Sequence, residues 1–310
     1  MAVRLHQNNL RSFVESFDNF IFDCDGVLWV HAGIVPGVPE LLQSLRKLGK
    51  KVFFVTNNNT KTREQFLEKF SKYGIQASHT EIYTSAYSTA YYIKNIMKCN
   101  KKVYMIGGKG LSEELTQLGI PNIGYGPDCI DEGTDVQYDD LEVDLDPEVG
   151  TVACGFDQFI SVKKYIKAST YIVNRGCNFI ATNMDDRLPT SNGITMPGTG
   201  CMVSFLATAT RKQPIVAGKP ARTSFDCIVH KYNIDPSRTL MVGDRLDTDV
   251  LYGHRCGTKA LLVLSGCTTL EDVDKAKRSS KPDDQEKVPD FYLPSIADLL
   301  PAVIEMLNES

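Results

Sequence analysis

Short apolar runs alternate along most of the chain with longer segments in which apolar residues recur at helical spacing. Runs of the first kind predict buried strands, and segments of the second kind predict amphipathic helices. The expected strands are 20–22, 52–55, 103–106, 151–154, 178–181, 215–217, 239–242 and 260–264. The expected helices are 38–48, 66–73, 112–118, 161–173, 225–232 and 295–307. This alternation is typical of an α/β protein built on a parallel sheet.

Two segments show no such period. Residues 121–150 combine Gly and Pro with many acidic residues, so we expect them to be mostly loop. Residues 271–290 are dense in charge, which predicts a mobile surface loop. The helix 295–307 carries an apolar stripe, and we expect it to dock on the core.

Composition excludes several classes of function. The 310 residues suffice for two domains or one large one, and a net charge of -4 gives no electrostatic footprint for nucleic acid or an anionic membrane. No apolar run approaches the ~18 residues that a membrane span needs. The N-terminal residues lack the apolar region of a secretory signal, and nine cysteines without a C-x-x-C pair indicate reduced thiols. We therefore expect a cytoplasmic protein without nucleic-acid or membrane partners.

Two carboxylates follow the first expected strand, at Asp23 and Asp25, with Gly26 next. A spacing of two projects both side chains toward the same side of the backbone, where unpaired carboxylates repel each other. A divalent cation, or a division of labour into nucleophile and acid/base, would relieve this repulsion. An acidic turn after a strand is the other interpretation of these residues taken alone. Cys24 between them should point away and be a packed thiol.

Asp23, Thr56, Lys219 and Asp244 each lie just beyond the carboxyl end of an expected strand. Open parallel sheets bind ligands at this edge, so we expect the four side chains to form one site. Asp23 and Asp244 could share Mg2+, a cation that prefers oxygen ligands. Lys219 would supply a positive charge, while Thr56 and the backbone amides at 57–58 would donate hydrogen bonds.

Such a set supports phosphoryl transfer. The positive charges would shield an anionic phosphomonoester from the attacking carboxylate. Asp23 could then attack phosphorus and form an acyl phosphate. Asp25 could protonate the leaving alkoxide and afterwards activate the water that hydrolyses the intermediate.

Four motifs together resemble the haloacid dehalogenase superfamily of aspartate-nucleophile phosphatases. They are D-x-D-G at 23–26, the threonine at 56, Gly-Lys-Pro at 218–220 and G-D-x-x-x-x-D at 243–249. The resemblance implies a Mg2+-dependent phosphomonoesterase with a Rossmann-like parallel-sheet core. It assigns catalysis to Asp23 and Asp25, phosphate or substrate binding to Thr56, Asn57, Asn58 and Lys219, and metal binding to Asp23, Asp244 and the backbone carbonyl of Asp25. Asp249 is expected to support the metal site without binding the metal directly.

The long stretch between Thr56 and Lys219 resembles the large α/β cap of one subgroup of this superfamily, which contains phosphoglycolate phosphatases, 4-nitrophenylphosphatases and pyridoxal phosphatases. We therefore expect a discontinuous core at 1–100 and 197–310 and a cap at 101–196. The resemblance also leaves a homodimer open.

Residues 181–189, 197–200, 242–249 and 288–292 are most similar to animal phosphoglycolate phosphatases. We therefore expect hydrolysis of 2-phosphoglycolate, together with glycerol 3-phosphate and 4-nitrophenyl phosphate. Pyridoxal phosphatase or broad small-molecule specificity is the alternative, although no histidine lies between His79 and His230 to match the pyridoxal enzymes. A noncatalytic scaffold on the same fold is a third interpretation, which the presence of both catalytic aspartates disfavours.

Asn183, Asp186 and Arg187 are candidates for a loop that faces the substrate. The alternative is a polar turn after the strand 178–181. Arg187 could pair with a substrate carboxylate, or it could form a salt bridge with Asp185 instead.

Overall fold

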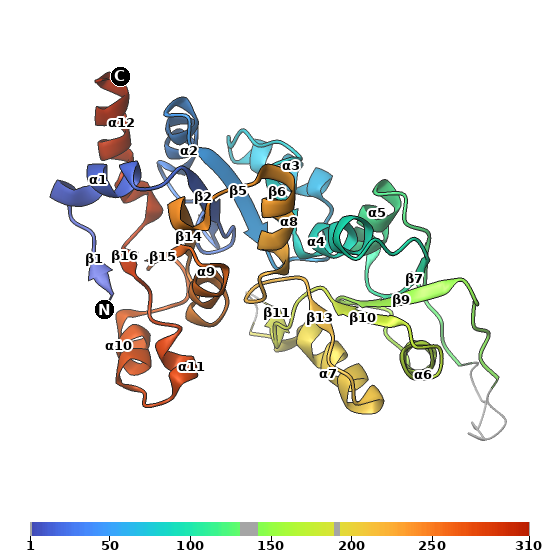
Figure 1. Cartoon of the computed structure of the whole chain (residues 1–310). Helices are drawn as coiled ribbons and strands as arrows, with labels where there is room; N and C mark the ends of the chain where they lie inside the picture. Colours follow the sequence, from blue (N-terminus) through green and yellow to red (C-terminus); the bar gives the residue numbers. More distant parts are fainter. Residues whose placement is uncertain (1, 131–141, 189–192, 310) are drawn as a thin grey trace. The chain divides into compact units, whose positions relative to one another are not determined.

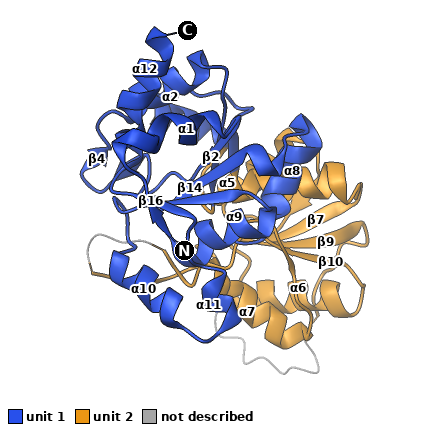
Figure 2. Ribbon diagram, turned by 60° about the vertical axis from the view of Figure 1, so that its left-hand side comes forward, with its two compact units in different colours: residues 1–56, 63–83, 219–310 blue, residues 57–62, 84–218 orange. Residues whose placement is uncertain are grey.

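The computed structural model describes residues 2–130, 142–188 and 193–309 (Figure 1). The chain divides into two compact units (Figure 2). Unit 1 comprises residues 1–56, 63–83 and 219–310, and unit 2 comprises residues 57–62 and 84–218. Unit 2 is therefore inserted into the sequence of unit 1.

Seven of the described strands form the main sheet of unit 1. Their spatial order is β1 (Val3–Arg4), β16 (Phe291–Leu293), β15 (Lys259–Val263), β14 (Thr239–Gly243), β2 (Asn19–Phe22), β5 (Lys51–Thr56) and β6 (Ile82–Thr84). The pairs from β1 to β5 are parallel, and Ile21 of β2 lies opposite Met241 of β14 and Phe53 of β5. β2 and β14 are thus neighbours in the middle of the sheet, where parallel strands are buried on both faces.

Helices surround this sheet and share its core. They are α1 (Leu10–Glu15), α2 (Val38–Lys47), α3 (Arg63–Lys72), α8 (Thr223–Tyr232), α9 (Leu251–Cys256), α10 (Leu270–Arg278), α11 (Pro282–Gln285) and α12 (Leu300–Asn308). Leu41 and Leu45 of α2 pack in one cluster with Phe22, Phe54 and Val303. These two leucines lie on the same face of the helix because they recur at helical spacing.

Short elements complete unit 1. The hairpin of β3 (Trp29–Val30) and β4 (Gly33–Ile34) follows β2, and π-helical residues Leu246–Val250 follow β14. Single 3-10 turns occur at Gln7–Asn9, Pro236–Arg238 and Ile296–Leu299.

The described strands of unit 2 form a five-stranded parallel sheet. Its order is β13 (Ile215–Val216), β10 (Asn178–Ala181), β9 (Val149–Cys154), β7 (Lys102–Ile106) and β8 (Asn122–Ile123). The helices are α4 (Ser85–Tyr91), continued by a π-helical turn at Tyr92–Ile96, α5 (Lys109–Gln117), α6 (Val162–Val173) and α7 (Thr199–Thr210). β11 (Arg187–Leu188) and β12 (Met196–Pro197) form a separate antiparallel pair.

Alternation along the strands of unit 2 divides its core into two clusters. Tyr104 and Ile106 of β7 pack in a cluster that contains residues of α6 and α7. Val103 and Met105, which point to the opposite face, pack with residues of α4 and α5. Side chains of a strand point alternately to the two faces, so helices cover both sides of this sheet.

Each strand and helix predicted from periodicity has a counterpart, and the α/β class with a parallel sheet is confirmed. The periodicity did not predict the helices α1, α4, α7, α9, α10 and α11 or the short strands β1, β3, β4, β6, β8, β11, β12 and β16. Part of the loop expected at 121–150, residues 131–141, lies outside the described residues, as does Pro189.

The prediction of a mobile loop at 271–290 is wrong, because α10 and α11 occupy much of it. The capping box of α10 is a local cause: Thr269 Oγ1 accepts from the Asp272 backbone N–H, and Asp272 Oδ2 accepts from that of Thr269. Val273 is buried beneath the charged surface. The last helix also begins later than expected, at Leu300, because residues 296–299 form a 3-10 turn.

The boundaries between the two compact units differ from the domain boundaries 100/101 and 196/197 that we expected from the sequence. Residues 84–100 belong to unit 2 because Ala86, Ala90 and Ile93 pack with its sheet. Residues 197–218 belong there because α7 joins the other cluster and β13 pairs with β10. Assignment of unit 1 as catalytic core and unit 2 as cap stays a prediction.

Among the residues that the structure describes, no helix has both the length and the apolar composition needed to cross a lipid bilayer.

A buried ion pair holds the start of α6 in unit 2. Lys164 Nζ lies 2.6 Å from Asp157 Oδ2, and neither side chain is exposed. Asp157 Oδ1 also accepts a hydrogen bond from the Phe159 backbone N–H at 2.8 Å. The pair therefore joins the loop after β9 to the first turn of α6.

Lys164→Met should destabilise the protein by about 3–5 kcal/mol, because it leaves the Asp157 carboxylate buried without its counter-charge. Urea unfolding followed by fluorescence and circular dichroism measures this change. The matched control is Lys163→Met, whose partly exposed pair with Asp128 should contribute no more than about 1 kcal/mol. Equal losses in the two variants would contradict the prediction.

Candidate active site

The two central strands of unit 1 carry the acidic residues that the motifs predicted. Asp23 follows β2 directly, and Asp244 follows β14. The Asp23 backbone N–H donates to the Val242 carbonyl at 2.9 Å, which continues the pairing of these strands. Both carboxylates therefore lie at the carboxyl ends of adjacent strands, as expected of a site on a parallel sheet.

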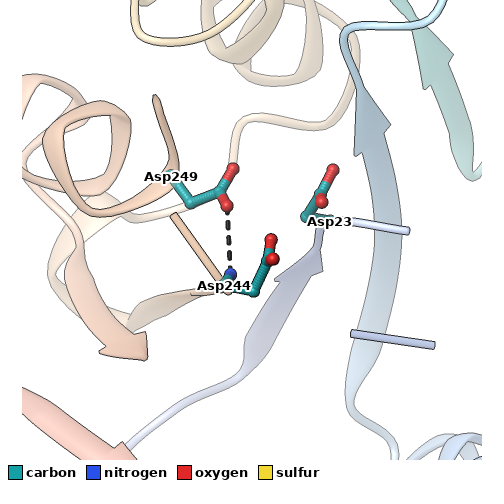
Figure 3. A group of neighbouring side chains, drawn as sticks. All are labelled: Asp23, Asp244 and Asp249. Carbon is teal, nitrogen blue, oxygen red and sulfur yellow. Dashed lines mark hydrogen bonds between the residues drawn. The ribbon is translucent and has the colours of Figure 1, made fainter. Parts of the chain in front are cut away.

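Asp23, Asp244 and Asp249 form a group in which one carboxylate oxygen of each lies within 4.8 Å of the others (Figure 3). Backbone N–H groups donate hydrogen bonds to two of these carboxylates, Asp249 and Asp244. Asp249 Oδ2 accepts from the N–H groups of Asp244 and Arg245 at 3.1 and 3.0 Å. Asp244 Oδ2 accepts from Cys267 N–H at 2.9 Å.

Glycine is required where the backbone passes these carboxylates. Gly26 has a φ of 86°, and a Cβ there would lie 2.4 Å from Asp244 Oδ2. A Cβ at Gly266 would lie 2.0 Å from the same oxygen. A side chain at either position would push Asp244 out of the group.

Lys219 is the positive charge of this group. Its side chain is 2% exposed, with Nζ 2.6 Å from Asp23 Oδ1 and 2.7 Å from Asp249 Oδ1. Burial alone would lower the pKa of Lys219, but the charges of Asp23 and Asp249 raise it. Burial raises the pKa of Asp23 and of Asp244, and repulsion between the carboxylates adds to both shifts.

The donor set fits a divalent cation. With all three carboxylates ionised, the group would carry two negative charges more than the single ammonium balances. Asp249 Oδ1 is buried, with the Lys219 ammonium 2.7 Å away. Carboxylate oxygens are the ligands of hard cations such as Mg2+ and Ca2+. The group could thus hold a metal through Asp23 and Asp244, with Asp249 as a neighbour or third ligand.

The strand that precedes Lys219 does not belong to the sheet that the sequence suggested. β13, which precedes Lys219, pairs with β10 in the sheet of unit 2 and not with the sheet that carries Asp23. An apolar run predicts a strand but not its partner, because pairing is set by contacts distant in sequence. The Lys219 side chain nevertheless reaches Asp23, as predicted.

Asp25 lies apart from the three-carboxylate group. It is exposed, and its Oδ1 accepts from Trp29 Nε1 at 2.7 Å and lies 3.5 Å from Lys69 Nζ. The Lys69 ammonium also lies 3.9 Å from the centre of the Trp29 ring. Neither partner could be predicted, because neither follows an expected strand. The roles predicted for Asp25, including metal binding through its carbonyl, stay predictions.

The predicted phosphate-binding segment begins in unit 1 and continues in unit 2. Thr56 is buried at the end of β5. Asn57 Nδ2 donates to Asp185 Oδ1 at 3.1 Å. Asn58 Oδ1 accepts from the backbone N–H groups of Thr60 and Lys61, which fixes the turn before α3. Phosphate binding by this segment stays a prediction, and the backbone amides are the groups suited to it.

The predicted substrate loop contains both buried and exposed residues. Asn183 is 1% exposed and hydrogen-bonded to Asn59 and Asp185, as expected of a polar turn. Asp186 and Arg187 are exposed. Cys24 is a packed thiol, as predicted: it has no exposed surface, and burial raises its pKa.

Comparison with known proteins identifies the family. A model described as haloacid dehalogenase-like hydrolase matches residues 20–121, and a second model of the same hydrolases matches residues 216–299. The chain is 42% identical to human glycerol-3-phosphate phosphatase, over 97% of this chain and 96% of that protein. The chain belongs to the haloacid dehalogenase-like hydrolases.

Other members of the family cover nearly the whole chain. Phosphoglycolate phosphatase 2 of Arabidopsis thaliana is 39% identical over 96% of each protein. The solved structure of p-nitrophenyl phosphatase from Archaeoglobus fulgidus is 31% identical, covers 92% of this chain and 99% of its own, and has a TM-score of 0.76. The two segments matched as haloacid dehalogenase-like hydrolase contain Asp23 and Thr56 in the first and Lys219, Asp244 and Asp249 in the second.

Asp244→Asn should weaken Mg2+ binding at least about tenfold, because it removes one charged oxygen ligand while retaining the shape of the side chain. Ligands that bind only the folded state raise its melting temperature, so a Mg2+ titration followed by thermal unfolding measures the affinity. Asp247→Asn in the same loop is the matched control, since Asp247 is exposed and paired with Arg245. Wild-type affinity in Asp244→Asn would contradict the assignment.

Proposed function

We propose that this haloacid dehalogenase-like hydrolase is a Mg2+-dependent phosphatase that hydrolyses small phosphomonoesters through a phosphorylated Asp23. The observation that carries the proposal is the position of Asp23, 2.6 Å from the buried ammonium of Lys219 and grouped with Asp244 and Asp249. This arrangement brings a nucleophile, a positive charge and a metal-binding donor set to one place.

The residues can divide the reaction between them. Lys219 neutralises part of the charge of the phosphate as Asp23 approaches it. An oxygen of Asp23 forms a bond to phosphorus while the bond from phosphorus to the ester oxygen breaks. Asp25 gives its proton to that leaving oxygen. Asp25 then takes a proton from water, which attacks phosphorus and releases Asp23 and inorganic phosphate.

A divalent cation held by Asp23 and Asp244 would neutralise charge and orient the phosphate when bound. We propose Mg2+, because it accepts one or two carboxylates together with phosphate oxygens. We also propose the cytoplasm as the compartment. All nine cysteines are free thiols, which suits a reducing environment.

The substrate we propose first is 2-phosphoglycolate, because the exposed guanidinium of Arg187 offers a partner for its carboxylate. Glycerol 3-phosphate is the second candidate, and the names of relatives from human, rat, mouse and chicken favour it. Pyridoxal phosphate stays an alternative without an observation of its own.

Replacement of the catalytic aspartates tests the mechanism. Asp23→Asn should abolish phosphate release from every ester, because an amide is a poor nucleophile. Asp25→Asn should slow hydrolysis of glycerol 3-phosphate about 10²–10⁴-fold. The loss should be smaller with 4-nitrophenyl phosphate, whose stable leaving group needs less protonation.

Steady-state phosphate release with Mg2+ measures these rates, and Asp247→Asn is the control that leaves the site intact. A wild-type rate in Asp23→Asn or Asp25→Asn would overturn the mechanism. No release from any ester by folded, Mg2+-loaded wild-type protein would favour a noncatalytic scaffold.

Arg187→Met tests the substrate. It should lower kcat/KM for 2-phosphoglycolate at least about tenfold while leaving that for 4-nitrophenyl phosphate nearly unchanged, because only the first substrate carries a carboxylate. Arg175→Met, at another exposed position of unit 2, is the matched control. An unchanged ratio of the two kcat/KM values would refute the role of Arg187 in selectivity.

A further inference from the structure

A buried hydrogen-bond network in unit 2 includes the residues that follow Thr56. Asn59, which is 2% exposed, is its central member. Its Nδ2 donates to Asn183 Oδ1 at 2.9 Å and to Thr199 Oγ1 at 3.1 Å. Its Oδ1 accepts from the Phe156 backbone N–H at 2.8 Å. Both amide hydrogens and the amide oxygen of Asn59 are therefore used.

The network continues to the residue next to Thr56. Asn183 Nδ2 donates to Asp185 Oδ2 at 2.9 Å, and Asp185 Oδ1 accepts from Asn57 Nδ2 at 3.1 Å. The Ser85 hydroxyl donates to the Asn57 carbonyl at 2.7 Å. The segment 57–62 is thus attached at two residues to the loops that follow β9 and β10 and to the start of α7.

The backbone at Gly218 packs against the same network. A Cβ on Gly218 would lie 2.5 Å from Asn57 Oδ1 and 2.7 Å from the Thr182 carbonyl oxygen. Gly218 precedes Lys219 by one peptide bond, just as Asn57 follows Thr56 by one. Thr56 and Lys219, two of the residues with a predicted phosphate-binding role, are therefore covalently joined to this one network of unit 2.

We propose that Asn59 is a positioning residue for the phosphate-binding turn and links that turn to the predicted substrate loop. The proposal rests on the proposed phosphatase function. Asn59 acts through the backbone at 57–58 and through Asn183, without touching the phosphate itself. Because Asn59, Asn183 and Thr199 are buried, water cannot replace the hydrogen bonds that a substitution at Asn59 removes. The affinity for phosphate should therefore depend on Asn59.

Asn59→Asp is the variant of choice, because it keeps the shape of the side chain but cannot donate to Asn183 or Thr199. The inhibition constant of inorganic phosphate should rise at least about tenfold, and KM for 4-nitrophenyl phosphate and for glycerol 3-phosphate should rise with it. The change in kcat should be smaller. Asn178→Asp is the matched control, since Asn178 is exposed on β10 and outside the network.

Thr199→Val provides a milder variant if Asn59→Asp folds poorly. It removes one acceptor of Asn59 with little change in volume, so the same constants should rise by a smaller factor while the melting temperature stays close to that of the wild type. Lower melting temperature and kcat with an unchanged phosphate inhibition constant would reduce Asn59 to a structural residue and overturn the inference. An inactive wild-type protein would instead overturn the proposed function.

Discussion

The site depends on the close approach of Asp23, Asp244 and Asp249, which repel one another and yet must stay together in a mostly buried place. The fold opposes this repulsion in two ways. The Lys219 ammonium lies within 2.7 Å of two of the carboxylates, and backbone N–H groups donate to one oxygen each of Asp244 and Asp249. With all three carboxylates ionised, an excess of negative charge would remain, and this excess favours a divalent cation.

The parallel sheet of unit 1 makes this approach geometrically simple. β2 and β14 are neighbours, so residues that follow them emerge side by side without a specialised scaffold. The loops then need close backbone contact, which glycine permits at positions 26 and 266. Gly26, Gly266 and Asp244 therefore pack closely together, and a Cβ at either glycine would displace Asp244.

Half of the described strands and α-helices, and the residues of the carboxylate group, could be predicted from the sequence, because burial on both faces leaves apolar runs and because Asp23 and Asp244 end two of them. Pairing could not be predicted in the same way: β13 joins the other sheet although Lys219 follows it. The helix α10 could not be predicted either, because it is rich in charged residues and its capping box and the buried Val273 give no apolar periodicity. The hydrogen bond from Trp29 to the Asp25 carboxylate could not be predicted either.

The segment 57–62 shows why the boundaries of the units and the substrate specificity are harder to predict from the sequence than the residues of the carboxylate group. Its residues follow a strand of unit 1, yet polar contacts with Asn183, Thr199 and Phe156 make it part of unit 2. Such contacts produce no periodic pattern in the sequence, because each depends on a single buried polar side chain and not on apolar residues that recur at regular spacing. All phosphomonoesters present the same phosphate to the carboxylate group, so selection among them must come from residues that meet the rest of the molecule. The exposed Arg187 begins β11, two residues after Asp185 of this network, so the proposed substrate choice and the proposed phosphate binding would have a common structural support.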